Sequence, residues 1–213
     1  FTLIATPLME RLPEGATMIA TQVASPFLTP FKMSLFVAVF LAMPVMLYQV
    51  WLFVAPGLYR KEKRFAYPLL LSSIVLFYAG VAFAYYVVFP LMFAFFAGVA
   101  PEGVTMMTDI SAYLDFILTI FFAFGLAFEV PIATVMLVWS GLVSIESLGK
   151  ARAYVFLGAF VLGMLLTPPD VISQTLLAVP VYLLYESGLI LARVLGPERD
   201  PSDESPKDES TGA

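Results

Sequence analysis

Carboxylates inside apolar segments are the groups of this sequence best suited to chemistry. Glu129 lies in the run FAFGLAFEVP, and the apolar segment around it contains no Lys, Arg or His to pair with it. A charged side chain at such a position costs about 2.5–3.5 kcal/mol to insert into a bilayer, so it suggests a function. Two interpretations stay open. Either a protonated Glu129 bonds to backbone freed by Pro131 or reaches water, or it lines a wet cavity or contacts a partner helix.

A second polar group surrounds the sequence TPPD, between two apolar segments. Asp170 directly precedes an apolar segment, where an aspartate commonly accepts hydrogen bonds from the first N–H groups of a helix. If the two flanking helices are short, Thr167, Asp170 and Gln174 lie at bilayer depth and form a polar site. Capping and a docking role both remain open. Glu186 and Asp115 lie near the ends of apolar segments, and we expect their side chains to reach toward water.

The loop LYRKEKRF places one carboxylate, Glu62, among four cations. A run of charges of this kind is commonly a solvated surface. It is also suited to docking, because a carboxylate accepts a guanidinium through two parallel hydrogen bonds. Composition alone does not choose between the two interpretations.

The sequence contains no His and no Cys. Imidazole and thiolate metal sites, haem ligation by these residues, and Ser-His-Asp or Cys-His nucleophiles are therefore excluded. We expect no catalytic residues, no metal and no cofactor, and a protein that is not an enzyme.

The elements that carry these residues are membrane-spanning helices. Of 213 residues, 61% are hydrophobic and 13% are charged, and the mean hydropathy is +0.92, which excludes a soluble globular protein. About 20 apolar residues suffice for one helical crossing. The sequence thus predicts an all-α polytopic membrane protein with five transmembrane helices, at about 33–55, 66–96, 113–139, 154–166 and 171–192.

Two of these segments have unusual lengths. The segment 154–166 reaches only about 20 Å as a helix, against about 30 Å of hydrocarbon, so it must extend at one end or thin the bilayer. The segment 66–96 is too long for one crossing, and we expect it to leave the hydrocarbon at Pro90. Pro44 and Pro131 lie inside apolar segments and should kink their helices.

Basic residues in the short loops predict the orientation. They concentrate in the loops 57–65 and 140–153, which the positive-inside rule places in the cytoplasm together with the C-terminus. The loops 97–112 and 167–170 then face outward, as does an external N-terminal segment, 1–32. Because the chain starts with Phe1 in an external segment, we expect that at least one N-terminal crossing precedes it.

The acidic net charge belongs to the C-terminal tail, 194–213. Six carboxylates against two cations give this tail −4 of the formal −5 of the chain. Its Pro, Ser, Gly and acidic residues cannot bury enough surface to offset the entropy of ordering, so we expect it to be disordered. The low pI therefore says nothing about a nucleic acid, and none is expected as a partner.

Several long stretches occur in a fixed order over about residues 2–193, namely ATQVASPFLTPFK, YQVWLFVAPGLYRKEKR, FAYYVVFPLMFAFF, FGLAFEVP and GAFVLGMLLTPPDVISQTLLAVP. Together they resemble the TatC family of the twin-arginine protein translocase. The resemblance implies six helices in a glove-like arrangement in the bacterial inner membrane, of which this chain lacks the first. It also implies a receptor for the twin-arginine signal peptides of folded cargo. Such a receptor self-associates and organises the single-span subunits TatA and TatB for export driven by the proton-motive force.

The resemblance also implies roles for individual residues. Glu62 and Phe53 match signal-peptide-binding residues, and Pro7 matches a structural proline. Glu129 matches an intramembrane glutamate. The residues that match the region contacting the TatA or TatB helix are Met164, Thr167, Asp170 and Gln174.

The alternative function is a secondary transporter or channel for a small solute, which would use the intramembrane carboxylate. Broken helices and a lone carboxylate favour it. The sequence shows no internal repeat and no matching pair of interrupted helices, which such transporters commonly contain. Co-purification of single-span partners distinguishes the two functions.

Overall fold

The computed structural model describes residues 19–54, 66–99, 108–167 and 170–195. Within these ranges the chain is almost entirely helical. The elements are α2 (Ser25–Val54), α3 (Ala66–Phe83), a π-helical turn (Ala84–Val88), α4 (Phe89–Val99), α5 (Ile110–Ala127), α6 (Val130–Trp139), α7 (Ile145–Lys150), α8 (Arg152–Leu166) and α9 (Val171–Leu195).

Four helical stretches of the described residues are long and apolar enough to cross a membrane, at 25–53, 67–96, 110–139 and 171–195. The fifth, α8, is apolar but has only 15 residues. This confirms the predicted all-α polytopic membrane protein. The first span differs at its start, because α2 begins at Ser25 and so includes residues that the sequence placed in the external segment.

The three prolines behave differently. Pro131 lies at the start of α6, directly after a break at Phe128 and Glu129, as the sequence predicted. Pro44 lies within α2, which remains one continuous helix. Pro90 does not end its helix. The chain passes through the π-helical turn just before Pro90 and continues as α4 to Val99. A π-helical turn shifts the hydrogen-bond register, which lets a helix accommodate a residue that lacks an N–H.

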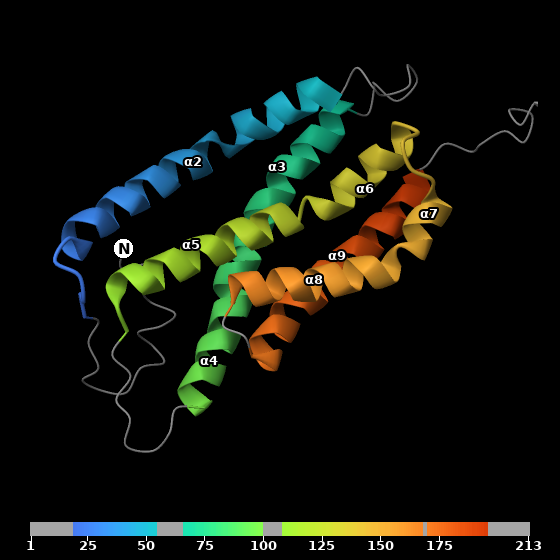
Figure 1. Ribbon diagram of the computed structural model, residues 1–213. Coiled ribbons are helices and arrows are strands. Elements are labelled where there is room, and N and C mark those ends of the chain that lie inside the picture. Colours follow the sequence, from blue (N-terminus) through green and yellow to red (C-terminus); the bar gives the residue numbers. More distant parts are fainter. Residues whose placement is uncertain (1–18, 55–65, 100–107, 168–169, 196–213) are drawn as a thin grey trace, which may run out of the picture.

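The helices pack in two groups that α5 and α6 connect. Figure 1 shows α2 beside α3 and α5 on one side, and the hairpin of α8 and α9 on the other. α5 packs chiefly on α3, whereas α6 packs chiefly on α9. Because α5 and α6 follow each other across the break at Phe128 and Glu129, this one break joins the two groups.

Glycines allow the closest helix contacts on each side of that break. A Cβ on Gly80 of α3 would collide with the carbonyl oxygen of Phe124 in α5, and one on Gly125 would lie 2.6 Å from the ring of Phe77. On the other side, a Cβ on Gly188 of α9 would lie 2.8 Å from Cα of Pro131. Each of these three contacts needs a residue without a side chain.

Candidate functional site

The tip of the α8–α9 hairpin carries the predicted partner-contact residues. Met164 is half exposed on α8, whereas Thr167 is buried at the end of that helix. The hydroxyl of Thr167 donates to the carbonyl oxygen of Gly163 at 2.8 Å. Thr167 thus satisfies its hydroxyl within its own helix.

Asp170 caps α9, as one of the two interpretations expected. Its Oδ1 accepts a hydrogen bond from the backbone N–H of Ser173 at 2.7 Å. Its Oδ2 is buried without a hydrogen-bond partner in the described structure, and so is the hydroxyl of Ser173, a residue that is 1% exposed. Buried polar atoms are usually hydrogen-bonded, so two buried polar atoms without a described partner at one place make this tip unusual. The sequence did not single out Ser173.

Gln174 lies on the face of α9 that packs against α8. A Cβ on Gly163 would lie 3.5 Å from Cα of Gln174, an ordinary contact, so the two helices approach closely there. The side chain of Gln174 is half-buried. Met164, Thr167, Asp170 and Gln174 therefore lie at the same end of the hairpin.

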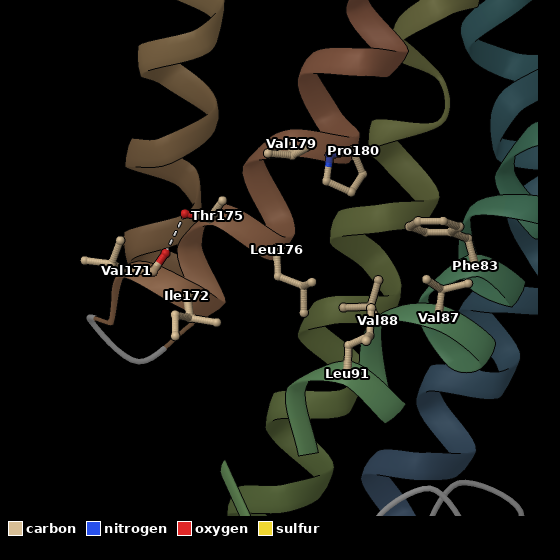
Figure 2. Close-up of a pocket in the computed structure, with 10 residues that line it drawn as sticks. All are labelled: Phe83, Val87, Val88, Leu91, Val171, Ile172, Thr175, Leu176, Val179 and Pro180. Carbon is tan, nitrogen blue, oxygen red and sulfur yellow. Dashed lines mark hydrogen bonds between the residues drawn. The ribbon is translucent and has the colours of Figure 1, made fainter. Parts of the chain in front are cut away.

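A separate apolar groove lies on a different face of α9 and is not part of this tip site. It has a volume of about 440 Å³. Its walls come from α9 and from the stretch around the π-helical turn (Figure 2). The lining residues include Ile172 and Val179 on one side and Val87 and Leu91 on the other. Thr175, its polar member, donates its hydroxyl to the carbonyl oxygen of Val171 at 2.6 Å, so the hydroxyl proton is already used within α9.

Glu129 has a partner that the sequence did not reveal. The hydroxyl of Ser73, on α3, donates to Oε2 of Glu129. Oε1 of Glu129 is buried with no hydrogen-bond partner in the described structure. This contact is to another helix, and no hydrogen bond of the described residues joins the carboxylate to backbone freed by Pro131.

Glu186 forms an ion pair that the sequence did not reveal, and its side chain stays partly exposed. Nε of Arg152 lies 2.7 Å from Oε1 of Glu186, and Nη2 of Arg152 donates to Oε2 of Glu186 at 3.0 Å. The hydroxyl of Tyr182 donates to the same carboxylate at 3.0 Å. Arg152 starts α8 and Glu186 lies on α9, so this pair ties the hairpin together opposite its tip.

Asp115 is also paired, with Lys32. Nζ of Lys32 lies 2.8 Å from both carboxylate oxygens, which links α2 to α5. Arg152 and Glu186 are 34 positions apart in the sequence, and Lys32 and Asp115 are 83 positions apart. Helix packing alone brings these partners together. Sequence reasoning treated each charge separately and missed both pairs.

Asp109 is a further capping residue that the sequence did not reveal. Its Oδ2 accepts hydrogen bonds from the hydroxyl of Thr21 at 2.6 Å and from the Thr21 N–H at 2.8 Å. Its Oδ1 caps α5 through the N–H groups of Ser111 and Ala112. The pKa of Asp109 lies well below its usual range. The hydrogen bond from the Thr21 hydroxyl is the largest cause, and the hydrogen bonds from the backbone N–H groups add to it.

The predicted signal-binding residues are only partly described. Phe53, near the end of α2, is 87% exposed, which is suited to contact with another molecule. Glu62, Pro7, the loop 57–65 and the tail from residue 196 lie outside the described residues. Within the described ranges, no group of three or more acidic residues could hold a metal ion.

Comparison with known proteins gives one consistent result. The family model for TatC, the Sec-independent protein translocase protein, matches residues 1–180. The chain is 62% identical to the Sec-independent protein translocase protein TatC of Azotobacter chroococcum, over 97% of this chain and 81% of that protein. It is 58% identical to the protein of the same name from Escherichia coli K12, over 91% of this chain and 75% of that protein.

Solved structures agree. A crystal structure of the twin arginine translocase receptor TatC superposes with a TM-score of 0.81 at 38% identity, covering 91% of this chain and 85% of that one. A second crystal structure of that receptor, in the detergent DDM, gives a TM-score of 0.82 at 39% identity, over 90% of this chain and 85% of that one. At this identity the likeness extends beyond the fold to the family.

Proposed function

The chain belongs to the TatC family of Sec-independent protein translocase proteins, and we infer that it is the receptor subunit of a twin-arginine translocase. It is a polytopic membrane protein and acts in protein translocation. The relatives and structures compared above are all translocase proteins, so nothing in them favours a small-solute transporter or channel. In this function the protein binds and organises other chains and performs no enzymatic step.

We propose that the partners are the single-span subunits TatA and TatB and the twin-arginine signal peptides of folded cargo. Phe53 and Glu62 are the proposed signal-binding residues. The exposed ring of Phe53 supplies an apolar contact, and a carboxylate at position 62 supplies the planar acceptor that a guanidinium recognises. Copies of the chain self-associate in the receptor complex.

The partner helix docks at the tip of the α8–α9 hairpin, at Met164, Thr167, Asp170 and Gln174. The observation that carries this proposal is the length of α8, whose 15 residues reach about 22 Å. The hydrocarbon is about 30 Å thick, so the tip lies within or close to it. A polar side chain there gains from a polar partner at the same depth, by about 0.6–2 kcal/mol, which suits a contact that forms and dissolves.

Co-purification tests the proposal. An affinity-tagged chain, extracted in mild detergent from membranes that contain TatA and TatB, should retain at least one of these subunits. Gln174→Leu should weaken the association, because it removes the amide while keeping the size of the side chain. Thr175→Val is the matched control, because Thr175 lies one residue along the helix, on the groove side, with its hydroxyl already satisfied. Recovery of the tagged chain without either subunit would contradict the proposal.

The orientation is a separate proposal, in which the loops 57–65 and 140–153 and the C-terminus face the cytoplasm of the bacterial inner membrane. Single cysteines test it directly, since the chain has none of its own. Ala112 and Ser147 are both exposed. A membrane-impermeant thiol reagent should label Ala112→Cys but not Ser147→Cys in intact cells, and the reverse pattern would overturn the orientation.

A further inference from the structure

The hydrogen bond between Ser73 and Glu129 lies at the break that joins the two helix groups. Ser73 is 1% exposed on α3, and Glu129 is the residue at which α5 ends and α6 begins. This hydrogen bond links α3 to the start of α6. A carboxyl in the hydrocarbon with a single donor depends strongly on that donor.

The backbone around the break is held by other contacts. The approach of Gly80 and Gly125 fixes the end of α5 on α3, and the approach of Gly188 to Pro131 fixes the start of α6 on α9. These contacts are made by backbone and rings, and none involves the hydroxyl of Ser73. Loss of that hydroxyl should therefore leave the helices in place and release only the carboxyl.

We propose that Ser73 is the positioning residue of Glu129, and that its hydrogen bond keeps the carboxyl out of water at the break until transport opens this site. When the bond breaks, the carboxyl has no described donor left and draws water toward the break. The contact itself follows from the geometry, whereas its role in transport rests on the proposed function.

The neighbouring serine provides a matched control. Ser72 donates its hydroxyl to the carbonyl oxygen of Pro68 at 2.9 Å, within its own helix. Ser72→Ala therefore removes a hydroxyl one position away without touching Glu129. Ser73→Ala removes the hydroxyl that holds the carboxyl. The two substitutions are chemically identical and differ only in the partner that is lost.

Thiol reactivity measures water at the break without depending on transport. Ala133 is exposed one turn after Glu129, and the chain has no other cysteine, so Ala133→Cys is a clean reporter. A water-soluble maleimide should react slowly with this reporter alone. Ser73→Ala should raise the rate roughly two- to tenfold, the change that the loss of one hydrogen bond produces. Ser72→Ala should leave the rate unchanged.

A second substitution removes the other partner of the hydrogen bond, the carboxyl of Glu129. With Glu129→Ala no carboxyl remains to draw water, so adding Ser73→Ala should no longer raise the rate. If Ser73→Ala alone does not yield folded protein, the double variant with Glu129→Ala should recover it, because no carboxyl is then left without a donor. An equal rate in Ser73→Ala and Ser72→Ala, or a rise that persists without Glu129, would overturn the proposal.

The transport measurement uses the same variants in membranes with TatA and TatB. Ser73→Ala should lower the export of a twin-arginine cargo by roughly two- to tenfold relative to Ser72→Ala. A raised maleimide rate with unchanged export would overturn the role in transport and leave the receptor function standing. Loss of co-purifying subunits in the unsubstituted chain would instead contradict the receptor function itself.

Discussion

The crossing of α3 and α5 and the tip of the α8–α9 hairpin are built in opposite ways. At the crossing, Phe77 and Phe124 are completely buried, and glycines let the two backbones touch. At the tip, Leu165 and Val171 are more than 70% exposed, while Oδ2 of Asp170 is buried without a hydrogen bond in the described structure. Around these rings and glycines the crossing is closed by packing, whereas the tip has exposed apolar surface and a buried polar atom that no described group satisfies.

This difference suggests how the molecule divides its tasks. Close packing and satisfied backbone give a helix pair one stable arrangement, which is what a scaffold needs. Lipid already covers exposed apolar side chains, so a partner helix gains chiefly by close packing and by satisfying unpaired polar atoms. We therefore expect substitutions at the crossing to reduce stability and substitutions at the tip to reduce association.

The largest effect is expected from adding one methyl group at the crossing. In Gly80→Ala the new Cβ collides with the carbonyl oxygen of Phe124, which is backbone and cannot rotate away. Overpacking of this kind costs about 1–3 kcal/mol or more. Thermal unfolding in detergent should show a clear drop in Tm.

Two glycines of the hairpin are the matched controls for that substitution. A Cβ on Gly158 meets nothing within 4 Å, and one on Gly163 makes ordinary contacts with Gln174. Alanine at either position should leave Tm unchanged or raise it slightly, because alanine favours a helix. A similar loss of Tm in all three variants would show that the crossing is not specially packed.

A smaller effect is expected from the ion pair at the other end of the hairpin. Glu186→Ala leaves the guanidinium of Arg152 without its carboxylate, and the expected cost is about 1 kcal/mol, because both side chains are partly exposed. Replacing both residues, with Arg152→Met and Glu186→Met, should recover part of that loss. If the free energy of unfolding of the double variant falls by the sum of the losses in the two single variants, the two residues do not act as a pair.

The smallest effect is a pH dependence at the cap of α5. The pKa of Asp109 is lowered in the folded protein, so its contribution to stability is complete above the unfolded value of about 3.8 and is lost as the pH falls below it. Asp109→Asn keeps a capping side chain but cannot titrate. Its Tm should fall less than that of the parent chain between about pH 6 and pH 3. An equal fall of Tm with pH in the parent chain and in Asp109→Asn would contradict the role of the carboxylate.

The sequence predicted the spans well because they depend on local composition. The segments 171–192 and 66–96 correspond to helices that start at the same residues, and the break at Pro131 follows from the missing N–H of proline. The sequence did not reveal how the helix continues past Pro90, because the π-helical turn just before that residue has no sequence signature here.

Pairings between helices could not be predicted from the sequence. Ser73 is one serine among several in apolar helices, and only the packing of α3 on α5 places it against Glu129. The same holds for Arg152, which counted only as a cytoplasmic charge until α8 and α9 were seen side by side. At the tip, the residue pattern around TPPD singled out Thr167, Asp170 and Gln174, the resemblance added Met164, and composition alone left capping and docking undecided.

Photocrosslinking from position 174 tests most directly whether the tip docks a partner helix. A photoreactive residue replaces Gln174, and the chain is illuminated in membranes that contain TatA and TatB. We expect a crosslink to one of these single-span subunits that weakens when Asp170→Leu makes the tip apolar, and that persists with the control Thr175→Val. Crosslinks confined to the same chain, with the subunits present, would contradict the account and leave the tip as a helix cap only.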